Sequence, residues 1–375
     1  MNKKDLFWQT YLNLENDFLD LSKYIFVSDE NGNNQLNVYS PYICDFLLRV
    51  CVEIEAISKE IYFDNGGTKT RGDTTLMFDT HCLKLIDKIY GTHKKVVLVT
   101  CSTFNLSKEE NKSFRPLREA HKQKGTDWER AYQAIKHDRY NSINKGTIKV
   151  LLHAIGALYL LNLYNKHIEI KTKYLEFSRL DFSFGSKLFS VAKPSEEYVI
   201  NVINNEDISN PLISNESPFI LKYTNESYLN IVSANQKSIE EKRKFFLTQP
   251  EMSDEEFLKV IEKAKEQEKL NPRNKMIFSW ELCKYRLNKR IPSSFSFEER
   301  KRLLISSPEW NGRIRLNNKH LSENELTAEN IQHEIDQAGI LWGMELDQRF
   351  DNNRFEKAFS GGVCEVVLDN GKINY

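Results

Sequence analysis

The sequence lacks several features that would place it in a common class of proteins. Its 53 basic and 53 acidic side chains leave no net charge, so any site for nucleic acid or another polyanion has to be local. Six cysteines are spread over 375 residues without a pair at two-residue spacing, which disfavours a zinc site and a disulfide framework. We expect reduced thiols, as in the cytoplasm.

A long hydrophobic run is also missing. The most apolar stretch extends from Val150 to Leu163 and contains His153, and it is shorter than the roughly 20 residues that cross a bilayer. The N-terminus leads into an amphipathic segment rather than the apolar core of a signal peptide. We therefore expect a soluble, cytoplasmic protein that does not bind a membrane.

Several catalytic motifs are absent. Residues 65–70 contain glycines and a lysine without the spacing of a phosphate-binding loop, and no hydrolase elbow, zinc-protease motif or dinucleotide fingerprint occurs. The acidic residues Glu334, Asp336, Glu345 and Asp347 would be spread around a helix, which favours a solvated face over a metal site. We expect neither a metal nor a cofactor.

Apolar periodicity predicts helices in the first half of the chain. Apolar residues recur every three or four positions over 7–25, and Ser40 and Pro41 provide the cap and first turn of a second helix that continues to Ile61. A stripe that begins at Trp128 predicts another helix, capped by Thr126 or Asp127. The segment 147–164 is apolar almost all round, which is typical of the central helix of a bundle.

Three further segments between these helices are less regular. Residues 79–89 predict a short helix, and 96–99 fit either a strand or an extended linker. Residues 105–125 are polar and basic, which indicates an exposed loop.

The second half combines β-prone and helical sequence. Short β-prone runs occur at 174–177, 188–191 and 198–200. Charge-rich helical sequence follows at 238–269, 278–288 and 297–304. The end of the chain, 361–375, predicts a hairpin that turns at Asp369, Asn370 and Gly371.

These patterns predict a mainly α protein with about two domains. Residues 1–165 form a helical bundle, and 166–235 form a β-prone connector or small subdomain. Residues 236–375 form a mainly helical region with the terminal hairpin, so the C-terminal part is mixed α+β.

The strongest candidate for chemistry is the segment 130–141. Arg130 and His137 are seven residues apart, so on one helix they share a face with a separation of roughly 10 Å. Lys136 and Arg139 add positive charge, and Asn141 follows one turn after His137.

The arginine followed by six residues and a histidine, ahead of a long apolar helix, resembles the motif of the HEPN family, and the resemblance covers residues 7–164. It implies a HEPN-like helical bundle that cleaves RNA without a metal and leaves a 2′,3′-cyclic phosphate. His137 would move the proton, Arg130 would stabilise the phosphate charge, and Lys136, Arg139 and Asn141 would bind RNA. It also implies a homodimer through the bundle and a role in phage defence, abortive infection or toxin-type growth arrest.

Other interpretations stay open. His137 and Arg139 could pair with Glu53 or Glu55 on the second helix and fix the bundle, in a non-catalytic protein for dimerisation and interaction. A nucleotide-binding or RNA-binding module without turnover is a further alternative. The C-terminal region would sense, regulate or recruit a partner.

The HEPN motif allows four to six residues between the arginine and the histidine, and a second match, with four, lies in the C-terminal part at Arg315 and His320. Together with Trp310 and Arg313 these residues would contact RNA or form a solvated turn.

Overall fold

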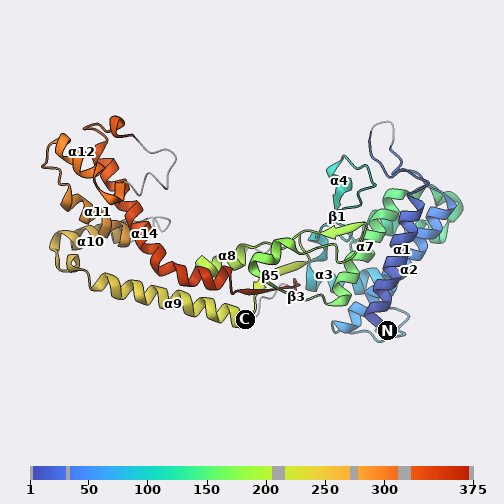
Figure 1. Ribbon diagram of the computed structural model, residues 1–375. Coiled ribbons are helices and arrows are strands. Elements are labelled where there is room, and N and C mark those ends of the chain that lie inside the picture. The colour runs from blue at the N-terminus through green and yellow to red at the C-terminus, as the bar shows by residue number, and fades with distance from the viewer. Residues whose placement is uncertain (1–2, 31–33, 205–215, 271–277, 311–321, 371–375) are drawn as a thin grey trace. The chain divides into compact units, whose positions relative to one another are not determined.

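The computed structural model describes residues 3–30, 34–204, 216–270, 278–310 and 322–370. The chain forms two compact units, Met1–Tyr228 with Gly362–Tyr375 and Leu229–Gly361 (Figure 1). Helices dominate the described parts of both units and are accompanied by small antiparallel sheets, which confirms a mainly α fold with some β structure. The division differs from the predicted segments, because most of the connector and the last strand belong to the first unit.

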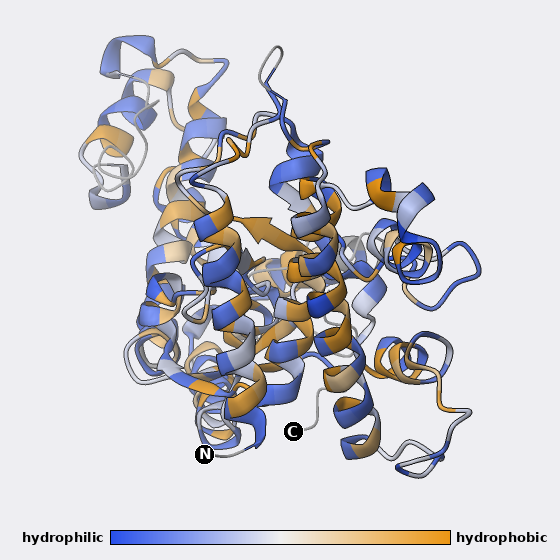
Figure 2. Ribbon diagram, turned by 90° about the vertical axis from the view of Figure 1, so that its right-hand side faces the viewer, coloured by the Kyte–Doolittle hydropathy of each residue, from blue (hydrophilic) through white to orange (hydrophobic). Residues whose placement is uncertain are grey.

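Four helices form the main packing of the first unit: α1 (Lys3–Leu21), α2 (Pro41–Asp64), α5 (Asp127–His137) and α7 (Ile148–Lys166). Helix α7 packs against the other three. The predicted start of α2 is confirmed, because the Ser40 side chain accepts a hydrogen bond from the Ile43 amide. Figure 2 shows hydrophobic and hydrophilic residues alternating along the helices, as expected for helices with one buried side.

Helix α7 is 19 residues long and is therefore longer than the apolar stretch suggested. Its length and composition would suffice to cross a membrane, but 83% of its most apolar window is buried inside the structure, as expected of a core helix. The absence of a polar face follows from this burial, since neighbouring elements surround the helix.

Shorter elements connect these helices. Within the first unit they are the π-helix η1 (Phe78–Leu83), α3 (Lys84–Tyr90), η2 (Thr92–Lys94), α4 (Glu109–Lys112), α6 (Arg139–Ser142), η3 (Ile143–Lys145), η4 (Tyr174–Arg179) and α8 (Glu197–Asn204). The β-prone runs at 174–177 and 198–200 do not form strands, because they lie in η4 and α8.

Two three-stranded antiparallel sheets complete the first unit. The first has the order β2 (Ser113–Phe114), β1 (Val97–Val99), β4 (Phe189–Val191). Strand β1 therefore decides between the strand and the linker predicted for 96–99, and the β-prone run 188–191 contains β4. The second has the order β3 (Ile170–Lys173), β6 (Val363–Leu368), β5 (Phe219–Tyr223). Strand β6 is the central strand and pairs with β3 and β5, whereas the return strand of the predicted terminal hairpin, 371–375, lies outside the described residues. Gly371 lies outside the described residues.

The second unit is helical. Its elements are most of α9 (Asn225–Leu247), η5 (Pro250–Ser253), α10 (Glu255–Leu270), α11 (Phe278–Arg290), α12 (Phe297–Ile305), η6 (Glu323–Glu325) and α14 (Ile331–Phe359). Helices α11 and α14 approach closely at Gly343, which has no side chain. A Cβ at this position would lie only 2.7 Å from the Cα of Trp280. Trp310 and Glu334 are buried, which contradicts a solvated turn at Trp310 and a wholly solvated face on α14.

Candidate functional site

Helix α5 begins with two reciprocal hydrogen bonds. The Thr126 hydroxyl accepts from the Glu129 amide, and the Glu129 carboxylate Oε2 accepts from the Thr126 amide at 2.7 Å. This capping box confirms Thr126 as the cap and fixes the direction in which the first turn projects its side chains. Asp127, Glu129 and Arg130 are all presented by this turn.

The segment ahead of α5, residues 115–125, is called the basic loop here. Its backbone is fixed to α5, because the buried Trp128 indole donates to the Pro116 carbonyl at 2.9 Å and Arg130 donates to the Gly125 carbonyl at 2.8 Å. Its cationic side chains remain exposed, as the sequence predicted. They are Arg115, Arg118, Lys122 and Lys124.

A histidine and an aspartate meet beside this loop. Nδ1 of His153, on α7, lies 2.7 Å from Oδ2 of Asp127, on α5. Burial raises the pKa of Asp127, but the hydrogen bond and charge of His153 outweigh it and leave this pKa below its ordinary value. An ionised carboxylate only accepts hydrogen bonds, so Nδ1 carries a proton, and Nε2 is the proton acceptor whenever the ring is neutral.

The His153 ring is also held from one face. Phe114, the last residue of β2, stacks on it with ring centroids 4.4 Å apart and an interplanar angle of 29°. Phe114 fits against α7 because residue 156 is glycine, and a Cβ there would lie 2.8 Å from the Phe114 ring. The aspartate and the phenylalanine together orient the imidazole.

The close approach at Gly156 yields a prediction about stability. Alanine is a better helix former than glycine by roughly 1 kcal/mol, so an open position would make Gly156→Ala stabilising. The Phe114 ring instead has to move, and we expect a loss of about 1–3 kcal/mol in the free energy of unfolding. Urea unfolding of wild type and variant measures whether the free energy of unfolding falls or rises. A stabilised variant would contradict the close packing of Phe114 on Gly156.

His153 and Asp127 line a cavity of about 270 Å³, called the basic cavity here. Its wall is rich in positive charge because the basic loop and α5 both contribute cations. These are Arg115, Arg118, Lys124 and Arg130. A cavity with an oriented imidazole and several cations suits binding of a phosphate group and transfer of a proton beside it.

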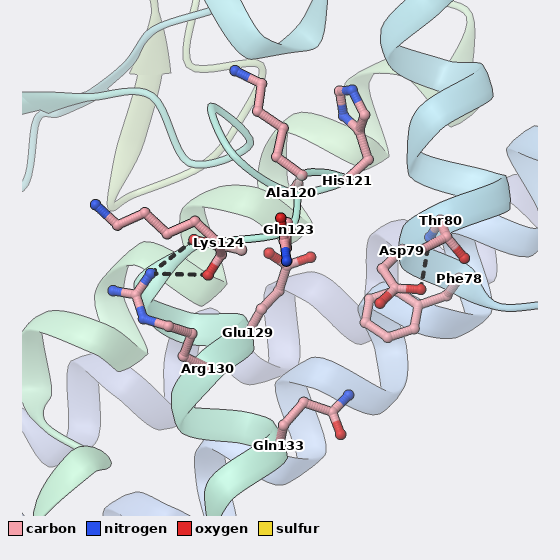
Figure 3. Close-up of a pocket in the computed structure, with 12 residues that line it drawn as sticks. Phe78, Asp79, Thr80, Ala120, His121, Gln123, Lys124, Glu129, Arg130 and Gln133 are labelled. Carbon is pink, nitrogen blue, oxygen red and sulfur yellow. Dashed lines mark hydrogen bonds between the residues drawn. The ribbon is translucent and has the colours of Figure 1, made fainter.

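A second cavity of about 460 Å³ adjoins the basic cavity and is called the carboxylate cavity (Figure 3). The two cavities share Lys124, Gly125 and Arg130 as lining residues. In Figure 3, Phe78 and Asp79 of η1 lie opposite Glu129 and Arg130. The carboxylate cavity therefore combines acidic and cationic groups.

Arg130 lines both cavities, whereas His137 lines neither. His137 is the last residue of α5 and is exposed, and no hydrogen bond or ion pair of its side chain occurs among the described residues. The structure thus brings Arg130 together with His153. Sequence reasoning missed His153 because it lies within the most apolar stretch, and its partner Asp127 is 26 residues away.

The other predicted residues make local contacts. Arg139 pairs with Asp45 at 2.8 Å, so its predicted pairing with Glu53 or Glu55 is wrong. Glu55 instead accepts from the Tyr132 hydroxyl at 2.8 Å. Glu53 is half-buried, and burial raises its pKa.

Lys136 and Asn141 are also bonded close to their own positions. The Lys136 ammonium lies 3.4 Å from the Tyr132 hydroxyl, and the Asn141 amide donates to Asp138 at 2.9 Å. The second motif match, Arg315 and His320, lies outside the described residues.

Within the described ranges, no three histidine, cysteine or acidic side chains come together to hold a metal ion. All six cysteines are unpaired thiols. No protein-family model, curated protein or solved structure matches this chain.

Proposed function

We propose that this protein is a metal-independent endoribonuclease in which His153 and Asp127 serve the reaction and the basic loop holds the RNA backbone. The observation that carries the proposal is the 2.7 Å contact between His153 Nδ1 and Asp127 Oδ2, on the wall of a cavity lined by four cations. RNA supplies its own nucleophile, the 2′-hydroxyl, so the protein needs to provide only proton transfer and charge stabilisation.

In the proposed step, the 2′-oxygen attacks the adjacent phosphorus and its proton passes to Nε2 of His153. The bond from phosphorus to the 5′-oxygen breaks, and the departing oxygen takes up a proton from solvent or a second acid. Arg118 and Lys124 stabilise the phosphate charge, and Asp127 stabilises the imidazolium that forms. The products are a 2′,3′-cyclic phosphate and a 5′-hydroxyl.

The biological context comes from the resemblance of Arg130 and His137 to the HEPN motif. On this basis we propose a HEPN-like bundle that acts in the cytoplasm as a homodimer, in phage defence or toxin-type growth arrest. His137 remains a second candidate for proton transfer, since an exposed histidine near neutral pH can serve in a complex with RNA. The role of the second unit as a regulatory or recruiting part belongs to the same proposal.

The proposal is tested by incubating the purified full chain with total bacterial RNA in EDTA and analysing the ends of any fragments. We expect fragments with cyclic phosphates and 5′-hydroxyls at an undiminished rate in EDTA. Fragments with 3′-hydroxyl ends, or cleavage that requires added magnesium, would contradict the mechanism.

A second candidate function is RNA or nucleotide binding without turnover. It is favoured by the anchoring of Arg130, whose Nη1 donates to the Gly125 carbonyl and so shapes the cavity wall. Binding of labelled RNA to the basic loop, with affinity that falls steeply as salt rises and with no fragments after long incubation, would support this function instead.

A further inference from the structure

Glu129 is a buried carboxylate with one oxygen unused. Its side chain is 7% exposed and lines the carboxylate cavity. Oε2 accepts the two Thr126 donors of the capping box, whereas Oε1 has no hydrogen-bond partner among the described residues. A buried acceptor without a donor costs free energy, and a ligand donor that pairs with it relieves this cost.

The groups around Glu129 also provide too few hydrogen-bond donors and positive charges for its carboxylate. Burial raises its pKa to about 7, Asp79 across the cavity adds to the rise, and the Thr126 bonds and Arg130 offset only part of it. Asp79 is half-buried, and its Oδ1 accepts from the Thr80 amide at 2.6 Å. Two carboxylates therefore face one cavity and have fewer donors than they can accept.

We propose that the carboxylate cavity binds a guanine base of RNA, with Oε1 of Glu129 and the carboxylate of Asp79 accepting its N–H groups. This inference rests on the proposed function, because RNA is the source of the base. A phosphate in the basic cavity and a base in the carboxylate cavity would both contact Lys124 and Arg130, which line the two. The volume of about 460 Å³ lies within the usual range of ligand pockets.

Guanine fits carboxylates better than the other bases do. Its Watson–Crick edge carries two neighbouring donors, N1–H and the 2-amino group, whereas adenine and cytosine place a ring acceptor beside their single amino group. Uracil has one N–H between two carbonyls. A ring acceptor or carbonyl would face a carboxylate lone pair and be repelled, so the chemistry selects guanine.

Other lining residues complete a base site. Phe78 is buried at the cavity wall and offers an aromatic surface, and the exposed amide of Gln133 lies below Glu129 in Figure 3. Aromatic side chains stack on bases, and amide side chains donate to carbonyl oxygens such as guanine O6.

The test is titration calorimetry of the full chain with GMP, IMP, AMP, CMP and UMP at pH 8, where the Glu129 carboxylate is ionised because this pH lies above its pKa of about 7. IMP lacks the 2-amino group and so isolates one donor. We expect GMP to bind about tenfold more tightly than AMP, CMP or UMP, with IMP between them. Equal affinities for all five nucleotides, or binding of none, would overturn the proposal.

Glu129→Gln is the decisive variant. Glutamine also completes a capping box, so the fold should persist, but its amide places a donor where guanine needs an acceptor. We expect the preference for GMP to disappear in this variant. Glu176→Gln is the matched control, because it removes an exposed carboxylate of η4 that lines neither cavity, and it should keep the preference. A preference that survives in Glu129→Gln would overturn the role of Glu129.

The two proposals fail in different ways. RNA cleavage at every base, together with equal nucleotide affinities, would leave the nuclease and remove the guanine site. Selective GMP binding without RNA cleavage would leave the site and remove the nuclease.

Discussion

Replacing His153 by alanine is expected to lower the rate of RNA cleavage by about 10²–10⁴-fold, the range that a positioned acid–base group contributes. The imidazole is held in place by Asp127 at 2.7 Å and by the Phe114 ring, so the variant loses a positioned proton acceptor. The variant loses a partly buried ring, and circular dichroism and a melting curve establish that it still folds. The measurement is the initial rate on a labelled RNA in EDTA.

His137→Ala is the matched control, because it removes the same side chain from the exposed end of α5. It is expected to keep most of the activity. Asp127→Asn should resemble His153→Ala, since an amide no longer fixes the Nδ1–H form of the ring. Full activity in His153→Ala together with none in His137→Ala would assign the reaction to His137 and contradict the site proposed here.

The sequence predicted the long helices in the first half of the chain well, because their evidence is local. The spacing of apolar residues, the Ser40 cap and the Thr126 cap act within a few residues of themselves, and each appears in the structure. The uniformly apolar 147–164 segment likewise became the central helix α7. Such features need no knowledge of distant parts of the chain.

The β structure was harder to predict because its partners are distant in sequence. Strand β6 near residue 365 pairs with β3 near 171 and β5 near 222, and no local pattern shows this choice. Residues 198–200 are β-prone by composition, yet they lie in helix α8, which buries Tyr198, Val199, Val202 and Ile203. Packing on one helical side outweighs their intrinsic preference.

The candidate site was predicted in part. The basic loop and Arg130 were identified from charge and spacing, and both line the basic cavity. The pairing of His153 with Asp127 depends on how α5 packs against α7, which one sequence does not reveal. A histidine inside an apolar helix was the available signal, because a buried imidazole needs a hydrogen-bond partner.

The ionisation of Glu129 predicts how stability depends on pH. Its pKa is about 7 in the folded protein, mainly through burial, against 4.5 ordinarily. Between these values the folded state keeps a proton that the unfolded state has lost. The stabilisation is therefore complete below pH 4.5 and is lost as the pH rises to 7, by about 3 kcal/mol in the free energy of unfolding.

Comparison with Glu129→Gln isolates this effect, since other titrating groups contribute equally to both proteins. The difference in unfolding free energy, measured by urea denaturation from pH 4.5 to 8, should grow with pH until about 7 and favour the variant. A difference that stays flat would contradict the burial of an ionisable carboxylate.

A glutamine at position 129 would thus complete the helix cap as glutamate does. At neutral pH it would also lower the free energy of unfolding less than the buried glutamate does. A carboxylate that lowers stability where a neutral side chain would suffice is the pattern expected of a ligand-binding residue. The stability curve and the nucleotide titration therefore test the same carboxylate in independent ways. If Glu129→Gln is more stable at pH 7 and shows no preference for GMP, the ionised carboxylate of Glu129 lowers the stability of the fold and is needed to bind the base.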